Sequence, residues 1–231
     1  TVSIISGPTG VGKTTLGSQF MKEAAGRGER SVIYKFEESI GTFLERTAAT
    51  NIPAREMMDR GTLVVEEVEP SDKSPAEFAA MVRREVEERD VQIVMIDGID
   101  GYRLSLQGAE DSLERELNNL GRYLKKMGVA VIFVDTVDAV TGDFTPTNGG
   151  VSYLADSIVF LRYLEIGGEL RKAVGILKKR TSDFERSLRE FAITPHGIKV
   201  GDPLDNLRGI LSGTPEFVNG HDRLQADGGS T

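Results

Sequence analysis

The sequence contains no cysteine and only two histidines among its 231 residues. A chain without cysteine forms no disulfide and no thiolate zinc site, and two histidines leave little from which to build a metal cluster. We therefore expect any bound metal to have oxygen ligands. No apolar run approaches the roughly 20 residues that a membrane-spanning helix needs, and no secretory signal pattern opens the chain. These absences predict a cytoplasmic protein without membrane contact.

An excess of basic residues is also lacking. Aspartate and glutamate outnumber lysine and arginine by 36 to 28, which gives a net charge of −8. A protein whose main task is to grip a nucleic-acid backbone usually has a basic balance or a concentrated basic stripe. The overall field of this chain repels phosphate, and this counts against nucleic acid as its main partner.

Short apolar runs alternate along the chain with helical stretches. The runs, which we interpret as buried strands, cover residues 2–6, 31–36, 62–68, 91–96 and 129–134. Helices are predicted from Lys13, from Pro75 to Arg89 with Ser74 before the first turn, and over about residues 109–127. This alternation predicts a mostly parallel sheet with helices on both faces, which is the doubly wound α/β class.

The pattern changes after about residue 155. Residues 158–166, 171–178 and 188–194 form strand-like runs separated by turns, and we expect them to make an antiparallel C-terminal extension of the sheet. From about residue 212 the chain has little apolar periodicity, which is typical of a flexible tail. We therefore expect one domain over residues 1–204 and a largely flexible tail over 205–231. Because the chain begins with Thr1 rather than methionine, we expect it to be part of a longer protein.

A glycine-rich segment between the first predicted strand and the first predicted helix matches the phosphate-binding P-loop, G-x-x-x-x-G-K-T. Its residues are Gly7, Pro8, Thr9, Gly10, Val11, Gly12, Lys13 and Thr14. Glycines let the backbone curl so that successive N–H groups face a phosphate, and the positive end of the following helix adds to this field. Lys13 is predicted to reach the β- and γ-phosphates, Thr14 to bind Mg²⁺, and Thr15 to donate to the α-phosphate. The segment therefore predicts ATP and Mg²⁺ as ligands.

Polar residues end two of the other predicted strands. Asp97 follows the run 91–96 and is the candidate Walker B acid, which would hold Mg²⁺ through water; the alternative is an ordinary strand-end aspartate that caps the next turn. Asp135 and Thr136 end the run that begins at residue 129. They are predicted either to sense the γ-phosphate or to cap the N-terminus of a helix.

Two adjacent acids, Glu37 and Glu38, follow the strand that ends at Phe36. They lie at the edge of a parallel sheet where ligands bind. A carboxylate near the γ-phosphate can orient and deprotonate the attacking water, so one of the two is a candidate catalytic base. The alternative is a pair of solvated loop acids.

Basic residues cluster at the end of the run 171–178. The period-two geometry of a strand puts Lys178 and Arg180 on one face and Lys179 on the other. The first two cations can form a finger pair that enters a neighbouring subunit's ATP site and stabilises transition-state charge. The alternative is a solvated strand edge that discourages pairing with another strand.

These segments together resemble the KaiC-like ATPases of the RecA superfamily. The resemblance covers nearly the whole chain, and it is carried by the P-loop, by Phe36–Ser39, by Ile96–Ile99 and above all by Tyr153–Phe191. It implies a RecA-like fold, Mg²⁺-dependent ATP hydrolysis and Lys13 in the catalytic machinery. It also implies that Glu37 and Glu38 are the family's catalytic glutamates and that Asp97 is its Walker B acid.

The resemblance further implies assembly into hexameric rings with ATP at the subunit interfaces. Lys178 and Arg180 match the family's contacts to the ATP of the neighbouring subunit, and Ser182 and Thr194 match positions that line the same surface. Relatives commonly carry two copies of this domain, so the chain is expected to be one copy.

Autophosphorylation is the least supported of the implied activities. The family's clock protein phosphorylates adjacent serine and threonine residues, and the matching positions here are Ser152 and Tyr153. The expected threonine is therefore missing, and Ser152 is open to a second interpretation as an ordinary residue at the start of a strand.

The leading hypothesis is an ATPase whose nucleotide state drives ring assembly or the binding of a signalling partner. A recombinase-like DNA-binding ATPase is the alternative, because residues 171–189 are locally basic, although the net charge opposes it. A silent scaffold that binds ATP without hydrolysing it is a third reading, and the presence of Glu37 and Glu38 argues against it.

Overall fold

The computed structural model describes residues 1–69, 71–105, 110–137, 154–180, 182–211 and 215–217. Within these residues, each helix is too short or too polar to span a bilayer.

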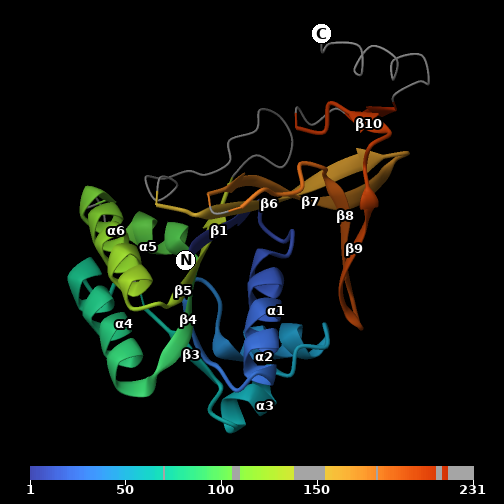
Figure 1. Ribbon diagram of the computed structural model, residues 1–231. Helices are drawn as coiled ribbons and strands as arrows, with labels where there is room; N and C mark the ends of the chain where they lie inside the picture. The colour runs from blue at the N-terminus through green and yellow to red at the C-terminus, as the bar shows by residue number, and fades with distance from the viewer. Residues whose placement is uncertain (70, 106–109, 138–153, 181, 212–214, 218–231) are drawn as a thin grey trace.

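A nine-stranded sheet with the order β3-β2-β4-β5-β1-β6-β7-β8-β9 organises the described residues (Figure 1). The first six strands in this order are paired in parallel, and they are β3 Leu63–Glu67, β2 Arg30–Lys35, β4 Val91–Asp97, β5 Ala130–Thr136, β1 Val2–Gly7 and β6 Ser157–Ile166. The antiparallel part consists of β7 Glu169–Lys179, β8 Arg189–Thr194 and β9 Gly197–Pro203. The predicted fold class, a mostly parallel α/β sheet with an antiparallel C-terminal extension, is confirmed.

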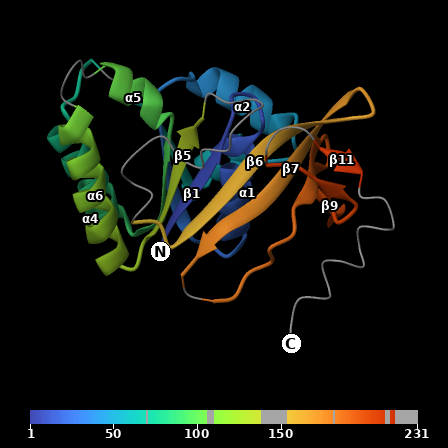
Figure 2. The same ribbon diagram turned by 90° about the horizontal axis from the view of Figure 1, so that it is seen from above.

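One detail of the predicted extension is wrong. The run 158–166 was expected to be antiparallel, whereas β6 pairs in parallel with β1, from Ser3 with Ser157 to Ser6 with Phe160. On its other edge β6 pairs antiparallel with β7. The sheet therefore changes from parallel to antiparallel between β6 and β7, and Figure 2 shows β5, β1, β6 and β7 in succession.

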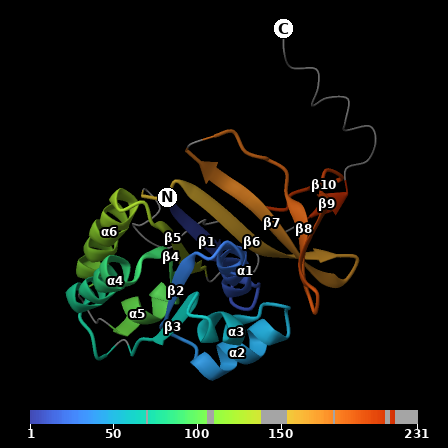
Figure 3. The ribbon, with the colours of Figure 1, turned by 60° about the horizontal axis from the view of Figure 1, so that its bottom comes forward.

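Helices cover both faces of the parallel part of the sheet (Figure 3). One face carries α1 Lys13–Gly26, α2 Ile40–Ala48 and α3 Ala54–Asp59, and the other carries α4 Pro75–Arg89 and α6 Glu110–Lys126. A short helix, α5 Ile99–Ser105, follows β4 directly. The start of α4 is fixed by a capping box, in which Ser74 accepts from the backbone N–H of Glu77 and the Glu77 carboxylate accepts from that of Ser74.

Alternating strand residues divide the apolar interior into two cores. In β1, for example, Ile4 packs in the core under α4 and α6, while Ile5 packs in the core under α1, α2 and α3. The same alternation separates Val32 from Ile33 in β2. Both faces of each central strand are buried, which is why these segments read as continuous apolar runs in the sequence.

Residues after β9 also pack against the sheet. Ile210 is buried in a small cluster with Leu164 and Ala173, and the guanidinium of Arg162 donates to the Leu211 carbonyl at 2.7 Å. Two short strands, β10 Leu207–Arg208 and β11 Glu216–Phe217, pair with each other. Leu207, Ile210 and Leu211 thus contact β6 and β7.

Candidate active site

The glycine-rich loop joins the carboxyl end of β1 to the first turn of α1. Gly12 directly precedes the helix with φ at 116°, a left-handed conformation that favours glycine. The Lys13 ammonium is buried and donates to the carbonyls of Gly7 at 2.8 Å and Pro8 at 3.0 Å. Desolvation lowers the pKa of Lys13, and nearby carboxylates, above all Asp97, partly oppose this shift.

Strands β6, β7 and β8 brace this loop. The Tyr163 hydroxyl donates to the Thr9 carbonyl at 3.4 Å, and the Lys172 ammonium donates to the Gly10 carbonyl at 3.2 Å. A Cβ atom on Gly12 would lie 2.4 Å from Cδ1 of Ile193, so β8 packs directly on the loop. Strands that are distant in sequence therefore fix the shape of the phosphate-binding backbone.

Thr14 and Asp97 meet at the floor of the site. The Thr14 hydroxyl lies 3.0 Å from each carboxylate oxygen of Asp97, to which it donates. Asp97 is the last residue of β4, as expected of a Walker B acid, and it is buried. Thr15 is buried one position farther along α1.

Lys35 is a member of this site that the sequence analysis did not identify. It ends β2 and pairs in register with Asp97 of β4. Its ammonium lies 2.6 Å from Oδ2 of Asp97 and 2.8 Å from Oε2 of Glu38, and its side chain is only 2% exposed. A lysine at the end of a buried strand, two residues before a pair of acids, was the signal that could have revealed it.

Glu37 and Glu38 have different surroundings although they are adjacent. Oε2 of Glu38 accepts from Arg46 at 2.8 Å as well as from Lys35. Glu37 is exposed, and its Oε1 accepts from the backbone N–H of Gly101 at 3.0 Å. Glu38 is thus held between two cations, whereas the Glu37 contact is with a neutral backbone group.

These groups line one cavity of about 230 Å³. Its lining residues are Thr9, Gly10, Lys13, Thr14, Lys35, Glu37, Glu38, Arg46, Asp97, Gly98, Val134 and Thr136. The three cations and three carboxylates among them balance, so the negative net charge of the chain does not extend into the cavity. Asp135 and Thr136 were the candidate sensors of the γ-phosphate. Thr136 lines the cavity, and Asp135, the preceding residue of β5, is buried.

The protein groups fit a magnesium ion that phosphate and water help to coordinate. Thr14 and Asp97 supply oxygen donors, which Mg²⁺ prefers. The described residues contain no cluster of three histidine, cysteine, aspartate or glutamate side chains that would hold a metal by itself. Mg²⁺ usually keeps several waters and binds through one or two protein groups plus substrate phosphates, so this sparse donor set suits it.

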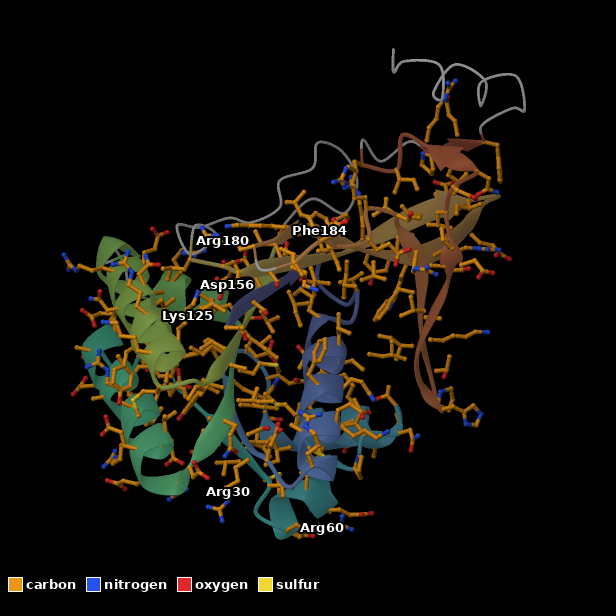
Figure 4. The ribbon with its side chains drawn as sticks, in the orientation of Figure 1. Arg30, Arg60, Lys125, Asp156, Arg180 and Phe184 are labelled. Atoms are coloured by element: carbon orange, nitrogen blue, oxygen red, sulfur yellow. The ribbon has the colours of Figure 1, made fainter. Side chains whose placement is uncertain are left out.

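Lys178 and Arg180 lie at the opposite edge of the sheet from the cavity. Lys178 pairs with Ile158 at the start of β6, and the Arg180 N–H donates to the carbonyl of Asp156 at 2.8 Å. The Asp156 carboxylate in turn accepts from the backbone N–H of Val2, at the amino end of β1. Figure 4 shows Arg180 beside Asp156 near this end.

The P-loop follows the carboxyl end of β1, which is six residues long and therefore spans about 20 Å. The register of β7 with β6 and of β6 with β1 sets Lys178 level with Ile4, in the middle of β1, and Arg180 level with Val2, at its amino end. The pKa of Lys178 is lowered by burial and by Arg180, against an opposing effect of Asp156.

The two other predicted surface residues, Ser182 and Thr194, lie at different places. Ser182 is exposed two residues after Arg180 in the chain, in the segment that follows β7. Thr194 ends β8, and the pairing of Glu190 with Ala173 directs β8 toward the start of β7, away from Lys178. Its hydroxyl donates to the Gly197 carbonyl at 2.8 Å within the β8–β9 turn. Ser152 and Tyr153 lie outside the described residues.

Comparisons with known proteins point to one family. The family model described as "ATPase: KaiC" matches residues 1–205. The chain is 29% identical over 217 residues to the circadian clock protein KaiC3 of Synechocystis sp., covering 94% of the chain and 43% of that relative. It is 26% identical over 218 residues to the circadian clock oscillator protein KaiC of Acaryochloris marina, covering 94% of the chain and 41% of the relative.

The chain thus spans less than half the length of these curated relatives. The family match extends from the P-loop through the antiparallel extension, and so includes every described group of the cavity. The chain belongs to the KaiC family of ATPases.

Proposed function

We propose that this chain binds ATP with Mg²⁺ and hydrolyses it, in a ring whose subunits complete one another's sites. The observation that carries the proposal is the convergence of the P-loop, Asp97 and Glu37 on one cavity, with a pair of cations at the opposite edge of the same sheet. Membership of an ATPase family supports the same function.

Each group in the cavity has a defined role in this proposal. The loop N–H groups and Lys13 bind the β- and γ-phosphates, and Thr14 and Asp97 are the groups that would hold Mg²⁺. Mg²⁺, when bound, supplies positive charge to the phosphate oxygens. Most of the rate acceleration in such sites comes from positioning the reactants and neutralising the phosphate charge, because the protein forms no covalent bond to the transferred phosphoryl group.

Glu37 is the better candidate of the two glutamates for orienting the attacking water. Its carboxylate lines the cavity and receives one backbone hydrogen bond, so it retains acceptor capacity for a water proton. Glu38 is neutralised by Lys35 and Arg46 and is held by them. We assign Glu38 the role of positioning these cations.

Lys178 and Arg180 would act on the ATP of a neighbouring subunit. They lie level with Ile4 and Val2 of β1, on the side of these residues away from the P-loop sequence, and neither lines the cavity of the same chain. A head-to-tail contact that repeats around a closed ring brings the far edge of one subunit to the cavity of the next. A hexamer is the assembly we propose, with nucleotide state controlling a protein partner in signalling.

The test is ATP turnover per chain measured across protein concentration, with molecular mass measured alongside. Wild type should gain specific activity as it assembles with ATP. The double variant Lys178→Ala with Arg180→Ala should still bind ATP but lose turnover, whereas Lys179→Ala, on the other face of the strand, should resemble wild type. Normal turnover by the double variant, or activity independent of assembly, would refute the shared site.

A further inference from the structure

Lys35 is a buried ammonium at the floor of the phosphate cavity. Its side chain is 2% exposed, and β2 is paired on both edges, with β3 and β4, so its backbone is fixed. Its ammonium also lies 5.0 Å from the centroid of the Phe43 ring of α2. A charge buried to this degree requires compensating partners.

The partners of Lys35 are two of the three acids of the cavity. Asp97 is the acid that the proposed function assigns to Mg²⁺, and the Lys35 ammonium lies 2.6 Å from its Oδ2. Glu38, the second partner, lies 2.8 Å away. The charge of the metal-binding acid is therefore matched by a protein cation whether or not Mg²⁺ is present.

Lys35 also adds to the positive charge that faces an incoming phosphate. It lines the same cavity as Lys13 and Arg46, and the loop carbonyls of Gly7 and Pro8 accept from Lys13. The effective dielectric constant in a partly buried cavity is well below that of water, so a unit charge there interacts more strongly with its neighbours. Its removal would thus alter both the binding of phosphate and the affinity of Asp97 for a metal.

We propose that Lys35 is a resident cation of the site that reduces the dependence of ATP binding on Mg²⁺. Together with Arg46 it balances the charges of Asp97 and Glu38, and so it takes over part of the charge that the metal would otherwise supply. This inference rests on the proposed function, because it assumes that the cavity binds ATP. Lys35 acts by its charge, on Asp97 and Glu38 through ion pairs and on the phosphates across the cavity, and it takes part in no bond-making step.

The test compares the Kd of a fluorescent ATP analogue in saturating Mg²⁺ with its Kd in EDTA. The ratio of the EDTA value to the Mg²⁺ value measures how strongly binding depends on the metal. Lys35→Met should raise this ratio about tenfold or more, which corresponds to roughly 1.4 kcal/mol. Two effects act in the same direction, because the loss of a cation weakens metal-free binding and Asp97 becomes available to the metal.

Lys172→Met is the matched control. It removes the same charge from a lysine that contacts the loop carbonyl of Gly10 but does not line the cavity. Its two Kd values should change by similar factors, so the ratio should stay within about threefold of wild type. A ratio for Lys35→Met that also stays within threefold of wild type, in folded protein, would overturn the inference and leave ATP binding intact.

Failure of the proposed function gives a different result. Wild type would then bind the analogue in neither condition, or Lys13→Ala would bind it equally well, and both proposals would fall together.

If Lys35→Met does not fold, the double variant Lys35→Met with Glu38→Gln removes the ion pair without leaving Glu38 charged. Compared with Glu38→Gln alone, the double variant should show the same rise in the ratio, and an unchanged ratio would overturn the inference.

Discussion

The contrast between Glu37 and Glu38 gives the sharpest prediction about catalysis. Replacing either by glutamine removes one carboxylate charge and keeps the size of the side chain. Glu37 is exposed and accepts from the backbone N–H of Gly101, which an amide oxygen can also do. We therefore expect Glu37→Gln to change the free energy of unfolding by less than about 0.5 kcal/mol.

The effect of Glu37→Gln on turnover should be large. An amide cannot accept the proton of the attacking water, and loss of a general base typically costs about 10²–10⁴-fold in rate. This range corresponds to roughly 3–5 kcal/mol of transition-state stabilisation. The Kd for ATP should stay within about threefold of wild type, because the proposed role of Glu37 begins only when water attacks.

Glu38→Gln should show the opposite pattern. The Glu38 side chain is 20% exposed and is paired with Lys35 and with Arg46, whose side chain is 36% exposed. The Arg46 pair is screened by water and contributes little, whereas Lys35 is buried and keeps Asp97 as its remaining partner. We expect a loss of about 1–3 kcal/mol in the free energy of unfolding, and a decrease in turnover of less than about tenfold.

Steady-state ATP hydrolysis and urea denaturation of both variants provide the assay. The reasoning would be refuted if Glu38→Gln lost as much turnover as Glu37→Gln, or if Glu37→Gln retained wild-type turnover. Either result would mean that the ion pairs around Glu38 do not separate the roles of the two acids.

Two further predictions concern groups that position the site. In Gly101→Ala, the new Cβ would lie 2.8 Å from Cγ of Glu37, so we expect the Glu37 carboxylate to be displaced. The variant should lose about tenfold or more in kcat with little change in Tm. An unchanged kcat would contradict this prediction. Burial raises the pKa of Asp156, whereas hydrogen bonds from Lys125 and from the N–H of Val2 lower it. The lowering effects are larger together, so the net pKa lies below the ordinary value of 3.8. Its stabilising effect is therefore complete above pH 3.8 and is lost as pH falls through the lower folded pKa. Asp156→Asn should lose about 1–3 kcal/mol at neutral pH, measured by urea denaturation, and this loss should shrink at acid pH; a loss independent of pH would contradict the assignment.

Much of the fold could be predicted from the sequence because its signals are local. The alternation of buried strands and helices, and the capped start of α4 at Pro75, depend on neighbouring residues alone. The P-loop is recognisable for the same reason, since its spacing lies within a single segment. Asp97 could be located because parallel strands bring their carboxyl ends to one edge.

The remaining features depend on contacts between distant segments. Lys35 belongs to the site because the register of β2 with β4 sets it opposite Asp97. The sequence of one strand does not show which residues of the neighbouring strand it will pair with. The surroundings of Glu37 and Glu38 differ because α5 supplies Gly101 to one and α2 supplies Arg46 to the other. The parallel pairing of β6 likewise depends on which edge of β1 is open to it.

The shared site is tested most directly by mixing two variants that each lack one half of it. Glu37→Gln keeps Lys178 and Arg180, and the double variant Lys178→Ala with Arg180→Ala keeps Glu37. After subunit exchange in an equal mixture, about a quarter of the interfaces in a ring should combine both intact halves. The account predicts that each variant is inactive alone and that the mixture regains about this fraction of wild-type turnover; activity no greater than the sum of the separate variants, in assembled mixtures, would contradict it.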